Sequence, residues 1–185
     1  MLRLLTFTLY LCLTAFSLPT SAAGLSFPAE VTYDNSLFQL SSRYRIGTRL
    51  FHKYTTEANS TNEKKSQDQE VIIQFAPDFY LKDAEWAYDI RGYFESFPVR
   101  PLYDISDIGG VPIARHLTRP DGRAEWLESS VMLFFPDACS GQVVFQHIKK
   151  IPVQDADLAR AWAQNNAMAL DLLKKLTWKP QCLSE

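Results

Sequence analysis

The chain has 185 residues, of which 46% are hydrophobic and 13% aromatic, and its formal net charge is −2 at pH 7. This length fits one domain with a sizeable core, and the aromatic content is typical of a well-folded protein. The mild acidity argues against nucleic acid as a partner, because binding to phosphates needs a basic surface.

Residues 1–23 have the pattern of a secretory signal peptide. Arg3 precedes an apolar run from Leu4 to Leu18, and small residues up to Ala23 form a cleavage site. The run is shorter than the roughly 20 residues of a membrane span, so we expect cleavage and no stable membrane span after it. The sequence therefore predicts a periplasmic or secreted protein whose residues 24–185 form a single domain.

The cysteines agree with export. Cys12 lies in the leader, so Cys139 and Cys182 remain, and an oxidising compartment would join them in a disulfide. This bond would close a loop of about 44 residues and stabilise the fold by roughly 4 kcal/mol in the chain-entropy model. Because no histidine lies at ligand spacing from either cysteine, we favour the disulfide over a catalytic or metal-binding thiol pair.

Residues 37–55 predict a strand bent at Gly47 or a β-hairpin, because apolar and polar residues nearly alternate. One face would hold Tyr44, Ile46, Leu50 and Tyr54. The other face would hold a basic row of Arg43, Arg45, Arg49 and Lys53. Residues 56–69 contain no large apolar residue and predict a mobile polar loop, in which Asn59 begins a glycosylation sequon that matters only in a eukaryotic secretory pathway.

The rest of the chain predicts strands between two helices. We expect a buried strand at 71–75, a helix at 83–97 and a closing helix at 156–177. Turn residues separate four further strands, at 102–108, 111–118, 124–135 and 142–150. The sequence thus predicts an α+β fold, a single-domain twisted antiparallel sheet covered by two helices.

Part of this pattern resembles a known group of proteins. The strand at 71–75, the aromatic-rich helix, the segment 108–115 and the Asp-Gly turn at 121–122 are similar to the PsbP-like and DcrB-like α/β/α sandwiches, over about residues 70–178. The resemblance implies an exported, non-catalytic accessory or binding protein. It transfers no active-site residue.

No recognised catalytic, phosphate-binding, dinucleotide-binding or calcium-binding motif occurs, and we expect no cofactor and no metal. Three histidines lie in predicted strands and would form a metal or acid-base site only if the strands brought them to one face: His52, His116 and His147. Scattered strand histidines are more often surface or core residues.

Two other sets of side chains, serines and acids, are candidate catalytic groups. Ser140 next to Cys139, or Ser129 and Ser130 with His116 and Asp121, would be a nucleophile with its base, but neither site is a strand-to-helix elbow. A carboxylate pair for glycoside hydrolysis would come from Asp104, Asp107, Asp121, Glu125 and Glu128. Acids are common at such turns and strand ends, so we predict that the protein is not an enzyme.

The basic row has two interpretations. As a stripe on one strand face, it would meet an acidic protein, an anionic lipid head group or a cell-wall polymer. As the charged edge of a sheet, it would prevent sheet-to-sheet aggregation, and this second interpretation is favoured.

By elimination, the sequence predicts a non-enzymatic protein-binding protein, such as an inhibitor, an immunity factor or an assembly accessory. One alternative is a carrier of a lipid or another small hydrophobic ligand, and another is an enzyme with an unrecognised site. In the carrier, an aromatic pocket would be lined by Trp126, Phe134, Phe135, Phe145 and Trp162.

Overall fold

The computed structural model describes residues 24–56, 69–77, 79, 83–97, 101–119, 126–136, 139–151, 157, 160, 162, 170–171, 173–174 and 176–183. The predicted signal peptide, Asn59 and most of the predicted polar loop lie outside these residues.

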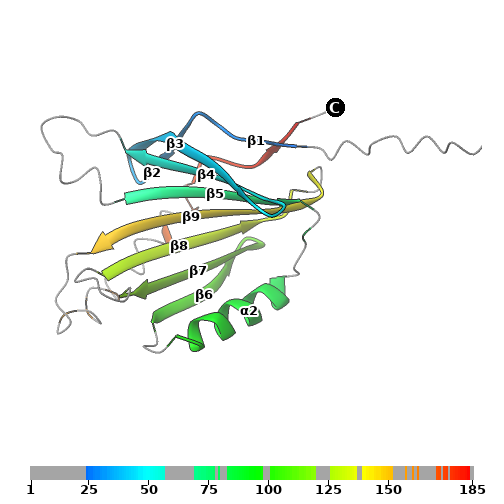
Figure 1. Ribbon diagram of the computed structural model, residues 1–185. Coiled ribbons are helices and arrows are strands. Elements are labelled where there is room, and N and C mark those ends of the chain that lie inside the picture. The colour runs from blue at the N-terminus through cyan, green and yellow to red at the C-terminus, as the bar shows by residue number, and fades with distance from the viewer. Residues whose placement is uncertain are drawn as a thin grey trace, which may run out of the picture.

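The regular structure of the described residues includes strands β1 to β10 and one continuous helix, α2 (Figure 1). The helix is Asp83–Glu95, and the strands are β1 Leu25–Ser26, β2 Glu30–Tyr33, β3 Ser36–Ile46, β4 Arg49–Thr56, β5 Gln69–Pro77, β6 Leu102–Ile108, β7 Val111–Thr118, β8 Trp126–Phe134, β9 Gly141–Ile151 and β10 Gln181–Cys182. Eight strands form one antiparallel sheet in the order β2-β3-β4-β5-β9-β8-β7-β6, and β1 pairs separately with β10.

Tight two-residue turns set the register of the hairpins. Asp34 and Asn35 both have positive φ between β2 and β3, as a type I′ turn requires, and Gly109 and Gly110 do the same between β6 and β7. Between β3 and β4, Gly47 has φ 59° at the first central position of the turn, and Ile46 pairs with Arg49. These turns explain why the short connections in the sequence join neighbouring antiparallel strands.

The two faces of the sheet bury different clusters. We call the face that contacts α2 the helix face: Trp86 and Phe94 of the helix pack there against Ala114 and Leu133. We call the opposite face the core face. It holds the larger cluster, which includes Phe38, Tyr54, Val71, Ile73, Ile113, Met132, Val143 and Phe145.

The sheet curls over its core face. In the sheet, β3, β4 and β5 separate β2 from β9, and a flat sheet would place β2 and β9 about 19 Å apart at roughly 4.8 Å per strand. Yet the rings of Tyr33 in β2 and His147 in β9 lie 4.8 Å apart, and Tyr33 also contacts Phe145 at 5.5 Å. A bulge in β3 between Leu40 and Ser42 contributes to this curvature, because bulges bend a strand and increase its twist.

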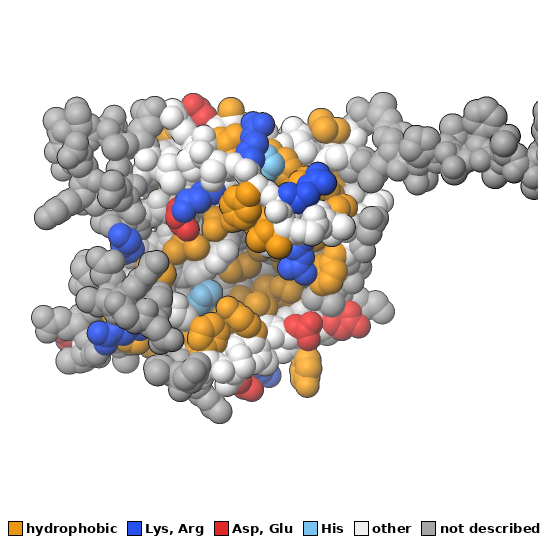
Figure 2. All heavy atoms as spheres, viewed as in Figure 1, with side chains coloured by type: hydrophobic (Ala, Val, Ile, Leu, Met, Phe, Trp, Pro, Cys, Tyr) orange, Lys and Arg blue, Asp and Glu red, His pale blue; other side chains and the backbone are white. Residues whose placement is uncertain are grey.

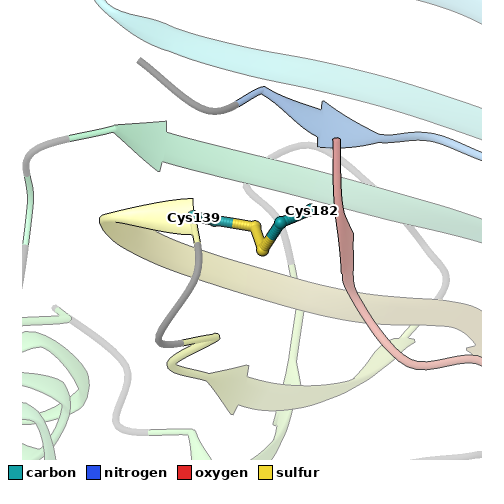
Figure 3. Close-up of a disulfide and its surroundings, with 2 residues drawn as sticks. All are labelled: Cys139 and Cys182. Carbon is teal, nitrogen blue, oxygen red and sulfur yellow. A yellow bond between two sulfur atoms is a disulfide. The ribbon is translucent and has the colours of Figure 1, made fainter. Parts of the chain in front are cut away.

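The predicted disulfide between Cys139 and Cys182 is confirmed (Figure 3). It joins the turn before β9 to the C-terminal strand β10, with the two Cα atoms 5.2 Å apart. Because β10 also pairs with β1, the bond fixes both ends of the described chain to the core cluster, in which Leu25 and Cys139 are buried.

The predicted fold class is wrong. The described residues are mostly strand, and α2 is the one continuous helix among them, rather than one of two that cover an α+β sheet. The sheet covers much of its core face itself by curling, and β1 and β10 pack on the same cluster. Most of the predicted closing helix at 156–177 lies outside the described residues, although Leu173 and Leu176 of this segment are buried in the core.

Individual elements were predicted well. The hairpin with its turn at Gly47, the strand at 71–75 and the helix from Asp83 are confirmed, and the predicted strands 102–108 and 111–118 coincide with β6 and β7. The short strands β1, β2 and β10 had no sequence signal, because two to four residues are too few to show a period.

Candidate functional site

A polar cluster lies inside the core face. Arg115 in β7 is fully buried and forms an ion pair with Glu128 in β8. The ring of Trp162 lies over the Arg115 guanidinium, with 4.8 Å between the guanidinium carbon and the ring centroid. A buried Arg needs such an anionic partner, because an unpaired charge in the interior is strongly destabilising.

Two further polar side chains lie close to this pair. Burial raises the pKa of Tyr33 well above its usual range, and the charge of Glu128 adds to the shift. His147 contacts the Tyr33 ring, and its Nε2 lies 3.1 Å from Oε1 of Gln69. Desolvation, together with Lys149, lowers the pKa of His147 to about 4, so it is neutral at pH 7. The cluster therefore contains one compensated ion pair and neutral side chains, which is the composition of a structural polar core.

The three histidines do not come together. His52 and His147 both lie on the core face but on β4 and β9, which β5 separates. His116 lies on the helix face, where its ring contacts Phe94 at 4.8 Å and burial lowers its pKa to about 4. Within the described ranges, no group of three His, Cys, Asp or Glu side chains is placed to hold a metal ion.

The serines proposed as nucleophiles lie in buried or turn positions. Ser129 is the cross-strand partner of His116, but its hydroxyl is buried and accepts a hydrogen bond from Gln146 Nε2 at 2.8 Å. Ser130 is buried opposite Arg115, and Ser140 occupies the turn after Cys139 with φ 45°. Asp121, the proposed orienting acid, lies outside the described residues.

The acids do not form an isolated carboxylate pair, because Asp104 and Glu128 both lie beside Arg115. Glu128 pairs with Arg115, Asp104 lies opposite Arg115 on β6, and Asp107 Oδ1 accepts a hydrogen bond from the Gly110 amide at 2.9 Å. Glu125 and Asp121 lie outside the described residues.

The aromatic residues proposed to line a ligand pocket pack in different parts of the fold, and Phe145 alone of the five is buried, while the others are partly exposed. Phe145 is completely buried between Tyr33 and Trp178, and Phe134 contacts the same Trp178. Phe135 packs in the other cluster, on the helix face. This arrangement gives the carrier hypothesis no support from those side chains.

The basic row is divided between the two faces. Cross-strand partners share a face, and Arg43 pairs with His52 while Arg45 pairs with Leu50, on the core-face side. Arg49 pairs with Ile46, and Lys53 pairs with Ser42. These two cations therefore lie on the helix-face side, with Tyr44 and Phe51, whose rings stack at 4.9 Å. The turn at Gly47 separates the two pairs, so a single stripe of four cations does not form.

Arg49 and Lys53 already have partners within the chain. Lys53 Nζ lies 2.5 Å from Glu70 Oε2 of β5, and the Arg49 guanidinium lies over the Phe79 ring at 5.3 Å. Arg43 pairs with His52 across the ladder. The pKa of His52 is lowered by burial and, to a smaller extent, by the positive charge of Arg43. The two arginines on the core-face side are thus the cations of the row best placed to meet another molecule.

The outer half of β3 is an edge of the sheet. β2 pairs with β3 only at Ser36–Gln39, and one further backbone hydrogen bond follows, from the Leu40 amide to the Ala29 carbonyl at 3.0 Å. From Ser42 to Ile46, β4 is the one strand of the described chain that pairs with β3. We call residues 42–46 the β3 edge.

This edge and its turn are exposed throughout. All nine residues from 41 to 49 are exposed, including Tyr44 at 43% and Ile46 at 62%. Basic and apolar side chains occur side by side over this end of the molecule (Figure 2). No Asp or Glu occurs between Asn35 and Thr56, so the segment is positively charged although the chain as a whole is acidic.

Sequence reasoning missed two features of the candidate sites. The first is the Arg115–Glu128 pair, for which a charged residue inside the apolar β7 pattern was a usable signal. The second is the bulge at Ser41, which the sequence pattern does not reveal. The Ser41 hydroxyl donates a hydrogen bond to the Lys53 carbonyl at 3.0 Å.

Comparison with known proteins gives no match among protein-family models, curated proteins or solved structures. The resemblance to PsbP-like and DcrB-like proteins therefore stays a prediction. Among the residues that the structure describes, no helix is both long and apolar enough to cross a membrane.

Proposed function

We propose that this chain is an exported, non-enzymatic protein-binding protein that contacts an acidic partner through the β3 edge and its turn. The observation that carries the proposal is the exposed, ordered segment 41–49, with three arginines, two large apolar side chains and no carboxylate. Tyr44 is 43% exposed although its ring stacks on Phe51, and Ile46 is 62% exposed, so both keep apolar surface that a partner would bury.

The chemistry of the segment suits a protein partner. Tyr and Arg are the side chains that most often dominate the binding energy of protein interfaces, and this short segment holds one tyrosine and three arginines. A local positive charge on an acidic chain also steers an acidic surface toward this end of the molecule. An inhibitor, an immunity factor or an assembly accessory would each use such a surface.

Two observations support export as part of the proposal. The Cys139–Cys182 disulfide agrees with an oxidising compartment, such as the periplasm or the extracellular space. Residues 1–23 have the pattern of a secretory signal peptide, which would direct the chain to export.

The proposal is tested by native mass spectrometry of the protein isolated from the compartment in which it accumulates. We expect a co-isolated acidic protein whose association weakens as salt is raised. Arg43→Ser/Arg45→Ser should reduce this association at least tenfold, whereas Lys174→Ser/Lys179→Ser, which removes two other exposed cations, should not. Equal association for both double variants, or the absence of any bound protein, would contradict the proposal.

A further inference from the structure

The β3 edge offers main-chain hydrogen-bonding groups as well as side chains. A two-residue turn closes with a hydrogen bond between the residues that flank it, so Ile46 and Arg49 form a hydrogen-bonded pair. Hydrogen-bonded and non-hydrogen-bonded pairs alternate along an antiparallel ladder. The amide and carbonyl groups of Arg43 and Arg45 therefore point away from β4, toward the open side of the edge.

The side chains of the edge alternate in chemistry. Arg43 and Arg45 project on the core-face side, and Ser42, Tyr44 and Ile46 project on the helix-face side. A strand added to this edge would place its own residues on the same two sides. Its complementary sequence would alternate acidic residues opposite the arginines with apolar residues beside Tyr44 and Ile46.

We infer that the partner binds by β-strand addition: an extended segment of about five residues, alternating acidic and apolar side chains, pairs with residues 42–46. The inference rests on the proposed function, since it specifies how the acidic partner docks. Main-chain bonds to Arg43 and Arg45 supply the register, and the alternating side chains supply the selectivity.

A second copy of the same edge is a poor occupant. Antiparallel pairing of two β3 edges centred on Tyr44 would place Arg43 of each copy directly opposite Arg45 of the other. Like charges opposite each other in a ladder are destabilising. The arginines thus prevent self-pairing and at the same time favour an acidic strand.

The probe for the test is a synthetic peptide that alternates Glu and Val over seven residues, and binding is measured by fluorescence anisotropy and by amide NMR on the full mature chain. We expect the amides of Arg43 and Arg45 to gain protection from hydrogen exchange when the peptide binds. A peptide of the same composition in which the Glu and Val residues form two blocks should bind at least tenfold more weakly. Equal binding of the two peptides overturns the inference, because bare charge would then suffice.

A matched pair of variants isolates the main-chain contribution. Arg45→Ser and Arg45→Pro remove the same charge, but only proline removes the outward amide, and an edge strand tolerates proline at such a position. We expect Arg45→Pro to bind the peptide at least fivefold more weakly than Arg45→Ser at an unchanged circular dichroism spectrum. If the proline variant does not fold, the test uses peptides that are N-methylated at every second amide. Methylation of the amides that face β3 should abolish binding, and methylation of the other amides should not.

The outcomes separate the two proposals. If Arg43→Ser/Arg45→Ser loses the natural partner but Arg45→Pro and Arg45→Ser bind alike, side-chain docking stands and strand addition is wrong. If the wild-type chain self-associates in sedimentation and the peptide does not compete, the edge pairs with another copy and the inference is overturned. Binding to anionic vesicles with no binding to the peptide overturns it as well.

Discussion

Glu128 of β8 lies diagonally across the ladder from Arg115 of β7 and forms an ion pair with it inside the core. Arg115 pairs directly with Ser130, so the carboxylate reaches the guanidinium from two residues along the same face. The ring of Trp162 also contacts the guanidinium, with 4.8 Å between the guanidinium carbon and the ring centroid. The pair therefore connects two strands of the sheet to the C-terminal segment.

Glu128→Gln should strongly destabilise the protein. The variant removes the carboxylate that forms the ion pair with the buried guanidinium, and losing one member of a buried ion pair costs about 3–5 kcal/mol of unfolding free energy. Urea unfolding followed by tryptophan fluorescence measures this loss. The matched control is Glu70→Gln, which breaks the half-exposed pair with Lys53 and should cost under about 1 kcal/mol.

The double variant Arg115→Met/Glu128→Leu makes this prediction sharper. It removes both charges and replaces them with apolar side chains, which for buried pairs is often neutral or stabilising. Stability well above that of Glu128→Gln is expected. If the double variant is as unstable as the single variant, the pair is needed for more than charge compensation.

Cys182→Ser should lower the unfolding free energy by about 2–5 kcal/mol. The disulfide holds β10, and through it β1, on the core cluster, so its loss frees both ends of the described chain. Differential scanning calorimetry with and without a reductant measures the effect. The reduced wild type and the variant should melt at the same temperature, and a reductant should leave the variant unchanged.

The sequence predicted the local elements better than their assembly. Alternation and turn residues are local signals, so β6 and β7 were predicted at their observed bounds. The curl that brings Tyr33 to His147 depends on twist summed over several strands, and no short segment encodes it. The sequence predicts two helices because a twisted sheet needs its apolar face covered, whereas a sheet that curls over its own face needs less cover.

The basic row shows how one turn changes a predicted surface. The alternation through residues 37–55 predicts one face for all four cations. Because a two-residue turn makes Ile46 and Arg49 cross-strand partners, odd-numbered residues lie on one face before the turn and on the other face after it. The bulge at Ser41 shifts the register again. Spacing along a single strand therefore predicts a shared face only when the chain neither turns nor bulges between the residues.

Acidification should destabilise the protein through two buried histidines. The pKa of both His116 and His147 in the folded state is about 4, below the value of 6.5 that each has when exposed. Between these values the unfolded state binds more protons, so stability is retained above pH 6.5 and lost as the pH falls toward 4. Each histidine accounts for at most roughly 3 kcal/mol of this loss in the free energy of unfolding.

Urea unfolding between pH 7 and pH 4.5 measures this dependence. Carboxylates also titrate in the acid range, so the informative quantity is the difference between the wild type and variants. His147→Gln should flatten the pH dependence, and His52→Gln should flatten it less, because His52 is less desolvated. Identical pH slopes for the wild type and His147→Gln would show that His147 is accessible to water.

Gly141→Ala and Gly92→Ala should have opposite effects on stability. At Gly141, the first residue of β9, an added Cβ would lie 2.6 Å from the Ala76 carbonyl oxygen and 2.8 Å from the Phe75 ring, so β5 and β9 would have to move apart. Such overpacking costs about 1–3 kcal/mol. At Gly92, in the helix α2, no atom lies within 4 Å of the added Cβ, and alanine should stabilise by roughly 0.5–1 kcal/mol. Thermal melts of the two variants measure both signs at once. A stabilised Gly141→Ala variant would mean that β5 and β9 are not packed as closely as the register of Gly141 with Pro77 requires.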